Sequence, residues 1–424
     1  MNSLLLKEQL RAGALSKYSC LYDNIEKETE RIIAAIEKFE ERYGTDRDIS
    51  VLSVPGRSEI LGNHTDHNHG KVMAGAINRD IIAVVAKNDR GEIRFFSEGY
   101  YESVIRLHLC GDKKNFKPFS SAALTAGMVK GFTDRGYEVG GFDAYTTTEV
   151  LKGSGLSSSA AFEVSIGNAL NHLYNGGSVD NKEIAKIAQY SENEYFGKPC
   201  GLMDQMACAV GGFVYIDFQD EKNPVVEPIE FSLGDHGYSL CIVNTGGSHS
   251  NLNDDYASVP AEMKAVAGAL GRDVLRGLSR DDIVKILPAL RRSVGDRAIM
   301  RAMHFLAENE RVEAARSALT SGDIDGFLHN ITASGSSSFK FLQNVYTTQN
   351  VREQGLSLAL CLTEEFLRER GGACRVHGGG FAGTIQGFIR REDVSAYREL
   401  MDGALGEGSV MPLFVRPLGA CKLF

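Results

Sequence analysis

Residues 141–174 read GFDAYTTTEVLKGSGLSSSAAFEVSIGNALNHLY, and their pattern changes in the middle. The first ten residues, rich in threonine and aromatic side chains, predict a β-strand. After the glycines and serines, apolar side chains recur along one helical face at Phe162, Ile166, Leu170 and Leu173. The stretch therefore predicts a strand that enters a glycine- and serine-rich turn and continues directly into a helix.

The turn itself, KGSGLSSSAA at residues 152–161, presents backbone N–H groups at the start of a helix. Such amides and the helix dipole suit a phosphate group, and the serine hydroxyls can reach a phosphate or a metal ion. The segment is not a Walker A loop, because no Gly-Lys-Ser/Thr follows the glycines. Taken alone, such a pattern is more often a tight turn with an N-cap serine.

Length and composition limit the classes of partner. At 424 residues the chain is long for one domain, so we expect two domains that share a cleft. The formal net charge is −9 and no lysine- or arginine-rich block occurs, which argues against nucleic acid and anionic membranes as partners. The eight cysteines include no CxxC pair, and no apolar segment resembles a signal peptide or a membrane span. We therefore expect a cytoplasmic protein with reduced thiols.

Further elements follow from local patterns. Residues 23–43 predict an amphipathic helix, and residues 80–87 and 92–98 predict a hairpin around the turn NDRG. A weak change of pattern near residues 225–237 suggests a domain boundary. Beyond it we expect a strand at 238–244, several helices across 257–370, and strands near the C-terminus.

A second glycine-rich segment, HGGGFAGT at residues 377–384, lies between two predicted strands. Consecutive glycines allow backbone conformations closed to other residues and a close approach by a ligand. The alternative is a flexible hairpin tip. Phe381 within the segment favours a loop that packs against other parts of the protein.

The segment GKPCGLMDQM places Asp204 one turn into a predicted helix among apolar neighbours. A carboxylate in such surroundings needs a partner, although a residue that only complements the helix dipole would look the same. Glu192, on the preceding helix, is a second carboxylate that can reach the same place.

Three histidines fall within GRSEILGNHTDHNHG, residues 56–70. The spacing of His64, Asp66, His67 and His69 matches no usual zinc pattern. Short, mixed hydrogen-bond donors and acceptors suit a polyhydroxylated ligand better than tetrahedral metal ligation.

Together these motifs resemble the GHMP small-molecule kinases, and among them the galactokinases most closely. The family patterns GRxNLIGEHTDYNxGxVLPxAI, LSSSA, CGIMDQ and GGGFGG correspond to GRSEILGNHTDHNHGKVMAGAI, LSSSA, CGLMDQ and GGGFAG, in the same order between residues 56 and 384. The resemblance implies a two-domain α+β GHMP kinase fold with the active site in the cleft between domains, which we assign to residues 20–230 and 231–424. It also implies ATP-dependent phosphorylation of a sugar at its anomeric hydroxyl.

The resemblance assigns roles to individual residues. It makes Asp204 the catalytic carboxylate and Arg57 the cation that orients it and offsets phosphoryl charge. It makes Ser159 and Glu192 ligands of Mg²⁺ and assigns sugar contacts to His64, Asp66, Gly201 and Tyr256. The ATP phosphate loop then comprises Gly153, Ser154, Gly155, Leu156, Ser157, Ser158 and Ser159.

The chain departs from the family pattern in the first motif. Asn63 replaces the glutamate that faces the sugar C6 hydroxyl in galactokinases, His67 replaces an aromatic residue, and Ser58-Glu59 replaces Val-Asn. A neutral amide at 63 and a cationic His67 would admit a C6 carboxylate, so galacturonate is an alternative to galactose, which the overall match favours. A non-catalytic sugar- and ATP-binding sensor is a third alternative, against which the complete catalytic set argues. We expect a monomer and leave a dimer open.

Overall fold

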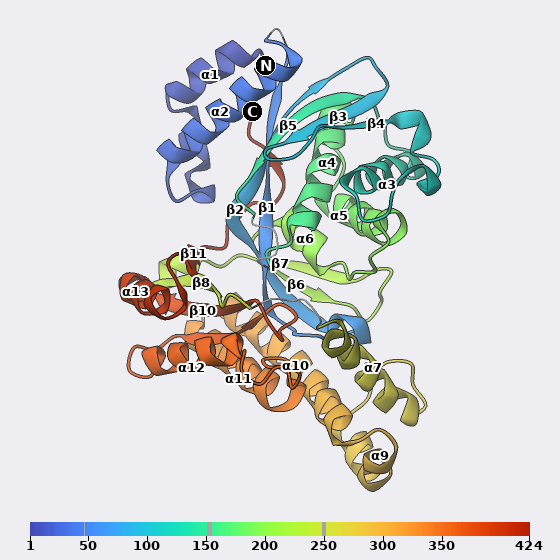
Figure 1. Ribbon diagram of the computed structural model, residues 1–424, viewed down its shortest axis with the longest axis vertical. Coiled ribbons are helices and arrows are strands. Elements are labelled where there is room, and N and C mark those ends of the chain that lie inside the picture. The colour runs from blue at the N-terminus through green and yellow to red at the C-terminus, as the bar shows by residue number, and fades with distance from the viewer. Residues whose placement is uncertain (46, 151–154, 248–251) are drawn as a thin grey trace.

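The computed structural model describes residues 1–45, 47–150, 155–247 and 252–424 and has the expected α+β architecture (Figure 1). Its larger sheet has eight strands. Their order is β12 (Cys421–Lys422), β1 (Ser50–Leu61), β2 (Lys71–Lys87), β5 (Phe142–Thr148), β3 (Glu92–Ser97) and β4 (Ser103–Arg106), while β6 (Phe213–Asp217) pairs with β2 and β7 (Val225–Ile229) pairs with β6.

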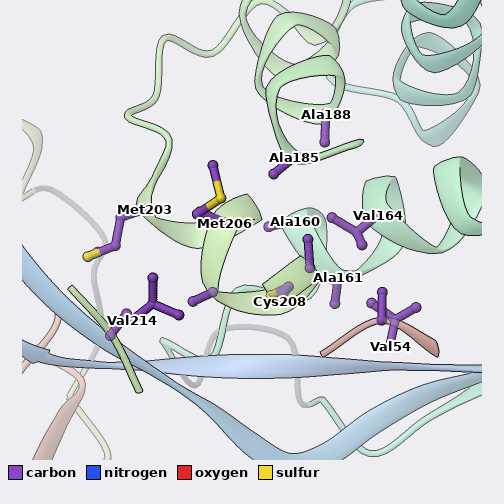
Figure 2. Close-up of a cluster of buried hydrophobic side chains, with 14 of the residues drawn as sticks. Val54, Ala160, Ala161, Val164, Ala185, Ala188, Met203, Met206, Cys208 and Val214 are labelled. Atoms are coloured by element: carbon purple, nitrogen blue, oxygen red, sulfur yellow. The ribbon is translucent and has the colours of Figure 1, made fainter. Parts of the chain in front are cut away.

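Helices cover both faces of this sheet. One face packs against α1 (Ser3–Arg11), the 3₁₀ segment η1 (Ala14–Leu21) and α2 (Ile25–Tyr43). The other carries α3 (Ser121–Asp134), α4 (Ser158–Tyr174), α5 (Asn181–Tyr190) and α6 (Met203–Val210). Alternate strand residues accordingly enter different cores, with Val51 and Leu52 as an example. Small side chains let α4, α5 and α6 pack closely, among them Ala160, Ala161, Ala185, Ala188 and Cys208 (Figure 2).

The predicted hairpin at residues 80–98 is wrong. Both strands form, but β5 lies between them, antiparallel to β2 and parallel to β3. The local pattern and the short turn favoured direct pairing of the two strands. Instead β5, which begins at Phe142, 55 residues after the Lys87 that it pairs with, takes the position beside β2. The β5–α4 junction expected at residues 141–174 is present on both sides of residues 151–154, which lie outside the described part of the chain.

The second sheet is built by the C-terminal half, in the order β11 (Val410–Leu413), β8 (Tyr238–Asn244), β10 (Thr384–Arg390) and β9 (Ala373–His377). Its helices are α7 (Asn253–Ala269), α8 (Arg280–Lys285), α9 (Leu287–Ser293), α10 (Asp296–Ser321), α11 (Ile324–Ser337), α12 (Gly355–Leu367) and α13 (Val394–Leu405). The chain then returns to the first sheet, where β12 pairs with β1. The domain boundary at 230/231 stays a prediction. That prediction did not include the return of the C-terminal strand β12 to the first sheet.

A buried ionic cluster ties the N-terminal helices and the C-terminal return to the large sheet. Asp80 of β2 is 1% exposed and accepts hydrogen bonds from Arg31 at 2.8 Å, Arg416 at 3.3 Å and the Tyr22 hydroxyl at 2.9 Å. Burial alone would raise the pKa of Asp80, but the two guanidinium groups lower it below its ordinary value. Because so many donors depend on one carboxylate, we expect Asp80 to dominate the stability of this region.

Asp80→Asn should lower the free energy of unfolding by about 3–5 kcal/mol, because it leaves buried guanidinium groups without a counter-charge. Urea denaturation followed by circular dichroism measures the loss. Asp296→Asn is the matched control, since Asp296 pairs with Arg291 where both side chains are more than half exposed. Equal unfolding midpoints for the two variants would contradict the assignment.

Within the part of the chain that the structure describes, no helix combines the length and the apolarity needed to cross a membrane.

Candidate active site

An ion pair between Arg57 and Asp204 joins strand β1 to the first turn of α6. Arg57 Nε donates to Asp204 Oδ1 at 2.7 Å, and the guanidinium also donates to the Gly155 carbonyl. The pairing of β1 with β2 shifts register between Pro55 and Arg57, and such an irregularity re-aims a side chain. Burial alone would lower the pKa of Arg57, but Asp204 raises it, so the guanidinium stays charged.

The second oxygen of Asp204 is also engaged. Ser157 Oγ donates to Asp204 Oδ2 at 2.5 Å, so one serine and one arginine fix the carboxylate between them. The Asp204 side chain is still 32% exposed, whereas that of Arg57 is 10% exposed. The carboxylate is therefore held in place and reachable by a small molecule.

The predicted phosphate loop precedes α4, and the start of that helix has no side-chain cap. Ser157 occupies the N-cap position with φ +57° but makes no capping hydrogen bond, because its hydroxyl is bound to Asp204. The first amides of the helix are thus available to an anion. Leu156 is fully buried in the core and anchors the loop, while Gly153 and Ser154 lie outside the described residues.

The two predicted metal ligands face each other across α4 and the turn after α5, a π-helical segment at Ser191–Phe196. Ser159 Oγ lies 3.5 Å from Glu192 Oε1, and Lys198 Nζ approaches the same oxygen at 3.3 Å. A hydroxyl and a carboxylate suit a hard cation such as Mg²⁺, which completes its shell with phosphate and water. Among the described residues no set of three acidic, histidine or cysteine side chains forms a metal cage, so protein ligation at this point is sparse.

Sequence reasoning missed the residues behind Glu192. Gln205 Nε2 donates to Glu192 Oε2 at 2.7 Å and lies 3.4 Å from Glu163 Oε2. Burial first, and then the charge of Glu192, raise the pKa of Glu163 well above its ordinary value. Their positions in the sequence could have identified these residues, since Gln205 follows the predicted catalytic Asp204 and Glu163 lies one helical turn after the predicted metal ligand Ser159.

Two of the predicted sugar contacts, Asp66 and Gly201, lie close to each other and to Asp204. Asp66 faces Gly201, where a Cβ atom would stand 2.9 Å from Asp66 Oδ2, and the charges of Asp66 and Asp204 interact. Burial raises the pKa of Asp66 above its ordinary value, an effect that His64 partly opposes. The aspartates and Gly201 therefore belong to one polar site.

The second glycine-rich segment forms the loop between β9 and β10 and packs over this site, as Phe381 suggested. Its carbonyls accept hydrogen bonds from predicted sugar-contacting side chains. His64 Nε2 lies 2.9 Å from the Gly379 oxygen, and the Tyr256 hydroxyl donates to the Gly380 oxygen at 2.6 Å. Gly380 has φ +82°, and a Cβ atom there would lie 2.0 Å from the Asn344 carbonyl oxygen, so only glycine fits.

Asn63 and His67 differ from their expected states. Asn63 is fully buried, and protein groups occupy both ends of its amide. Burial, followed by the neighbouring His64, lowers the pKa of His67 to about 3, so its ring is neutral at pH 7. The structure has neither the open amide nor the positive charge on which the galacturonate alternative rested.

Glu308 of α10 fastens the first motif to the C-terminal half. Its Oε1 accepts from Gly62 N at 3.1 Å and from Ser334 Oγ at 2.6 Å, and its Oε2 accepts from Arg311 Nε at 2.7 Å. Burial alone would raise the pKa of Glu308, but Arg311 and His304 lower it to about 2.

The pKa of Glu308 in the folded protein lies below its ordinary 4.5, so the ionised group stabilises the fold at higher pH. We expect that contribution, about 3 kcal/mol, to vanish as the pH falls from 4.5 toward 2. Glu308→Gln should flatten this part of the stability–pH curve, measured by urea unfolding. Glu310→Gln, on the exposed face of α10, is the control. An unchanged slope in Glu308→Gln would refute the assignment.

Known proteins resemble this chain in sequence and in fold. Residues 123–212 match the GHMP kinases N-terminal domain, and residues 37–87 match the galactokinase galactose-binding signature. The fold is that of solved GHMP kinases. A Lactococcus lactis galactokinase complexed with galactose superposes with a TM-score of 0.76 at 24% identity, over 92% of this chain and 100% of that one. A Methanococcus jannaschii mevalonate kinase gives a TM-score of 0.59 at 15% identity, over 88% and 99%.

Curated relatives narrow the class. Galactokinase of Streptomyces coelicolor is 30% identical over 377 residues, 87% of this chain and 91% of that protein. Galactokinase of Glaesserella parasuis is 30% identical over 368 residues, 86% and 91% of the two chains. The chain is thus a GHMP kinase. It belongs to the galactokinase family, whose members are sugar kinases.

Proposed function

We propose that this protein transfers the γ-phosphoryl group of ATP to the anomeric hydroxyl of galactose. The observation that carries the proposal is the position of Asp204, held by Arg57 and Ser157 directly beside the open amides of α4. A sugar hydroxyl bound to Asp204 would lie next to a phosphate bound at that helix. The galactokinase names of the relatives favour galactose as the acceptor.

The chemistry needs positioning and charge neutralisation more than a strong base. Phosphoryl transfer passes through a loose transition state with charge on the phosphoryl oxygens. Asp204 orients the hydroxyl in line and accepts its proton, while Arg57 offsets the phosphoryl charge. Ser159 and Glu192 would hold Mg²⁺, which neutralises the phosphate oxygens of ATP when it is bound.

Further properties stay predictions. We expect the other sugar contacts to come from His64, Asp66, Gly201 and Tyr256. All eight cysteines are free thiols, as a reducing cytoplasm requires, and we expect a monomer there. Neither argument for galacturonate as the substrate holds, because Asn63 has no free amide and His67 is neutral.

ADP release coupled to NADH oxidation, measured with galactose, galacturonate, N-acetylgalactosamine and arabinose, tests the proposal. We expect galactose to give the highest kcat/KM, at least about tenfold above galacturonate, because the Asn63 amide is saturated and the nearby Arg375 is buried against Glu59. A higher kcat/KM for galacturonate would reverse the assignment of the substrate. Absence of turnover with every sugar would favour the non-catalytic alternative.

Asp204→Asn should lower kcat by about 100-fold or more, because the amide keeps a hydrogen bond but cannot accept the proton of the sugar hydroxyl. The KM for ATP should change little, which steady-state kinetics at saturating galactose can measure. Asp220→Asn, on an exposed turn, controls for the substitution itself. If the kcat of Asp204→Asn stays within about threefold of the parent value, Asp204 is not the acceptor of the proton.

A further inference from the structure

Two buried polar residues of the first motif bond to each other. Asn63 Nδ2 donates to Glu59 Oε1 at 2.9 Å, where Glu59 is 7% exposed and Asn63 is fully buried. The same carboxylate oxygen lies 3.3 Å from Nη2 of Arg375, which is also fully buried. An arginine, a glutamate and an asparagine thus form one chain of contacts that water does not reach.

The amide of Asn63 has a defined polarity. Its Nδ2 also donates to the Gly378 carbonyl at 2.7 Å, and its Oδ1 accepts from Asn344 Nδ2 at 2.6 Å. A carboxylate at position 63 would place an oxygen against two acceptors, Glu59 and the Gly378 carbonyl. Glu59 therefore favours an amide at position 63, since two buried carboxylates in contact with each other repel, and neither could donate a hydrogen bond to the Gly378 carbonyl.

This pair positions the glycine loop at residues 377–381. Asn63 holds the Gly378 oxygen, and Asn344, fixed by Asn63, holds the Gly379 oxygen at 3.1 Å. His64, the next residue along the chain, contacts the same Gly379 oxygen. The polarity set by Glu59 is thus passed through the Asn63 amide to the loop that His64 also contacts.

We propose that Glu59 and Asn63 act as one positioning unit for this loop, in which the acid and the amide have exchanged places relative to the family pattern. In that pattern the asparagine stands at position 59 and the glutamate at position 63, whereas this chain has Glu59 and Asn63. Each residue alone breaks the pattern, but together they keep one acid and one amide in contact. The sugar readouts of the proposal rest on the proposed function.

The test exchanges acid and amide without changing their size. Asn63→Asp should raise the KM for galactose by about tenfold or more and lower the melting temperature, because two acids then face each other. Glu59→Gln in the parent should also lower the melting temperature and raise the KM for galactose, since it removes the carboxylate in direct contact with Arg375. In the Asn63→Asp background, however, Glu59→Gln should lower the KM for galactose and raise the melting temperature, because it removes the repulsion between the two acids.

The effect of Glu59→Gln thus changes sign between the parent and the Asn63→Asp background. Two residues that stabilise the protein independently would not show this reversal, so it shows that Glu59 and Asn63 act together. The KM for ATP should change less than the KM for galactose, because the loop that Asn63 and Asn344 hold contacts His64, on the predicted sugar side of the site, through the Gly379 oxygen. Asn171→Asp is the matched control. Asn171 is a buried amide in α4 whose Nδ2 donates to the Val179 carbonyl at 3.0 Å. Its change should lower the melting temperature, leave the galactose KM unaltered, and leave Glu59→Gln harmful.

The proposal is overturned if Glu59→Gln is equally harmful in both backgrounds, or if Asn63→Asp alone changes neither quantity. The melting temperatures test whether Glu59 and Asn63 act together without any measurement of enzyme activity. If the parent releases no ADP with any sugar, the proposed function fails, while the sign of the Glu59→Gln effect on melting temperature still tests the unit.

Discussion

The arrangement of the site depends on how the carboxylate of Asp204 is held. Arg57 binds one oxygen and Ser157 the other. Ser157 belongs to the predicted phosphate loop, and Arg57 donates to the Gly155 carbonyl of that loop. The irregular pairing of β1 turns Arg57 toward α6, and the use of the Ser157 hydroxyl leaves the first amides of α4 uncapped. In the function that we propose, this one ion pair places an acceptor for a sugar hydroxyl and a binding site for a phosphate side by side.

The C-terminal half completes the site through main-chain carbonyls. The oxygens of Gly378, Gly379 and Gly380 each accept a hydrogen bond from a polar side chain, and those donors come from three separate parts of the sequence, Asn63-His64, Tyr256 and Asn344. Glu308 adds a fixed contact to the Gly62 amide from α10. A loop rich in glycine has little preferred conformation of its own, so these contacts determine where it lies.

The sequence was sufficient for features that local chemistry controls. Strands β5 and β8, helices α2 and α4, and the glycine-rich loop between β9 and β10 lie where periodicity and turn residues predict them, and the motif order identified the family. Pairing between distant segments was not accessible, so β5 was not expected between β2 and β3. The states of Asn63 and His67 were not accessible either, because saturation of an amide and burial of an imidazole depend on neighbours such as Asn344 that are remote in the sequence.

These two residues show how an argument from residue type changes when the contacts are known. A histidine in a sugar-binding loop suggests a positive charge, but His67 is too deeply buried to hold a proton at pH 7. An asparagine in place of a glutamate suggests the loss of a negative charge, but Glu59 supplies that charge to the same amide and Arg375 balances it. The departure from the family pattern therefore leaves the local charge unchanged, and it moves the acid from the loop into the strand beneath it.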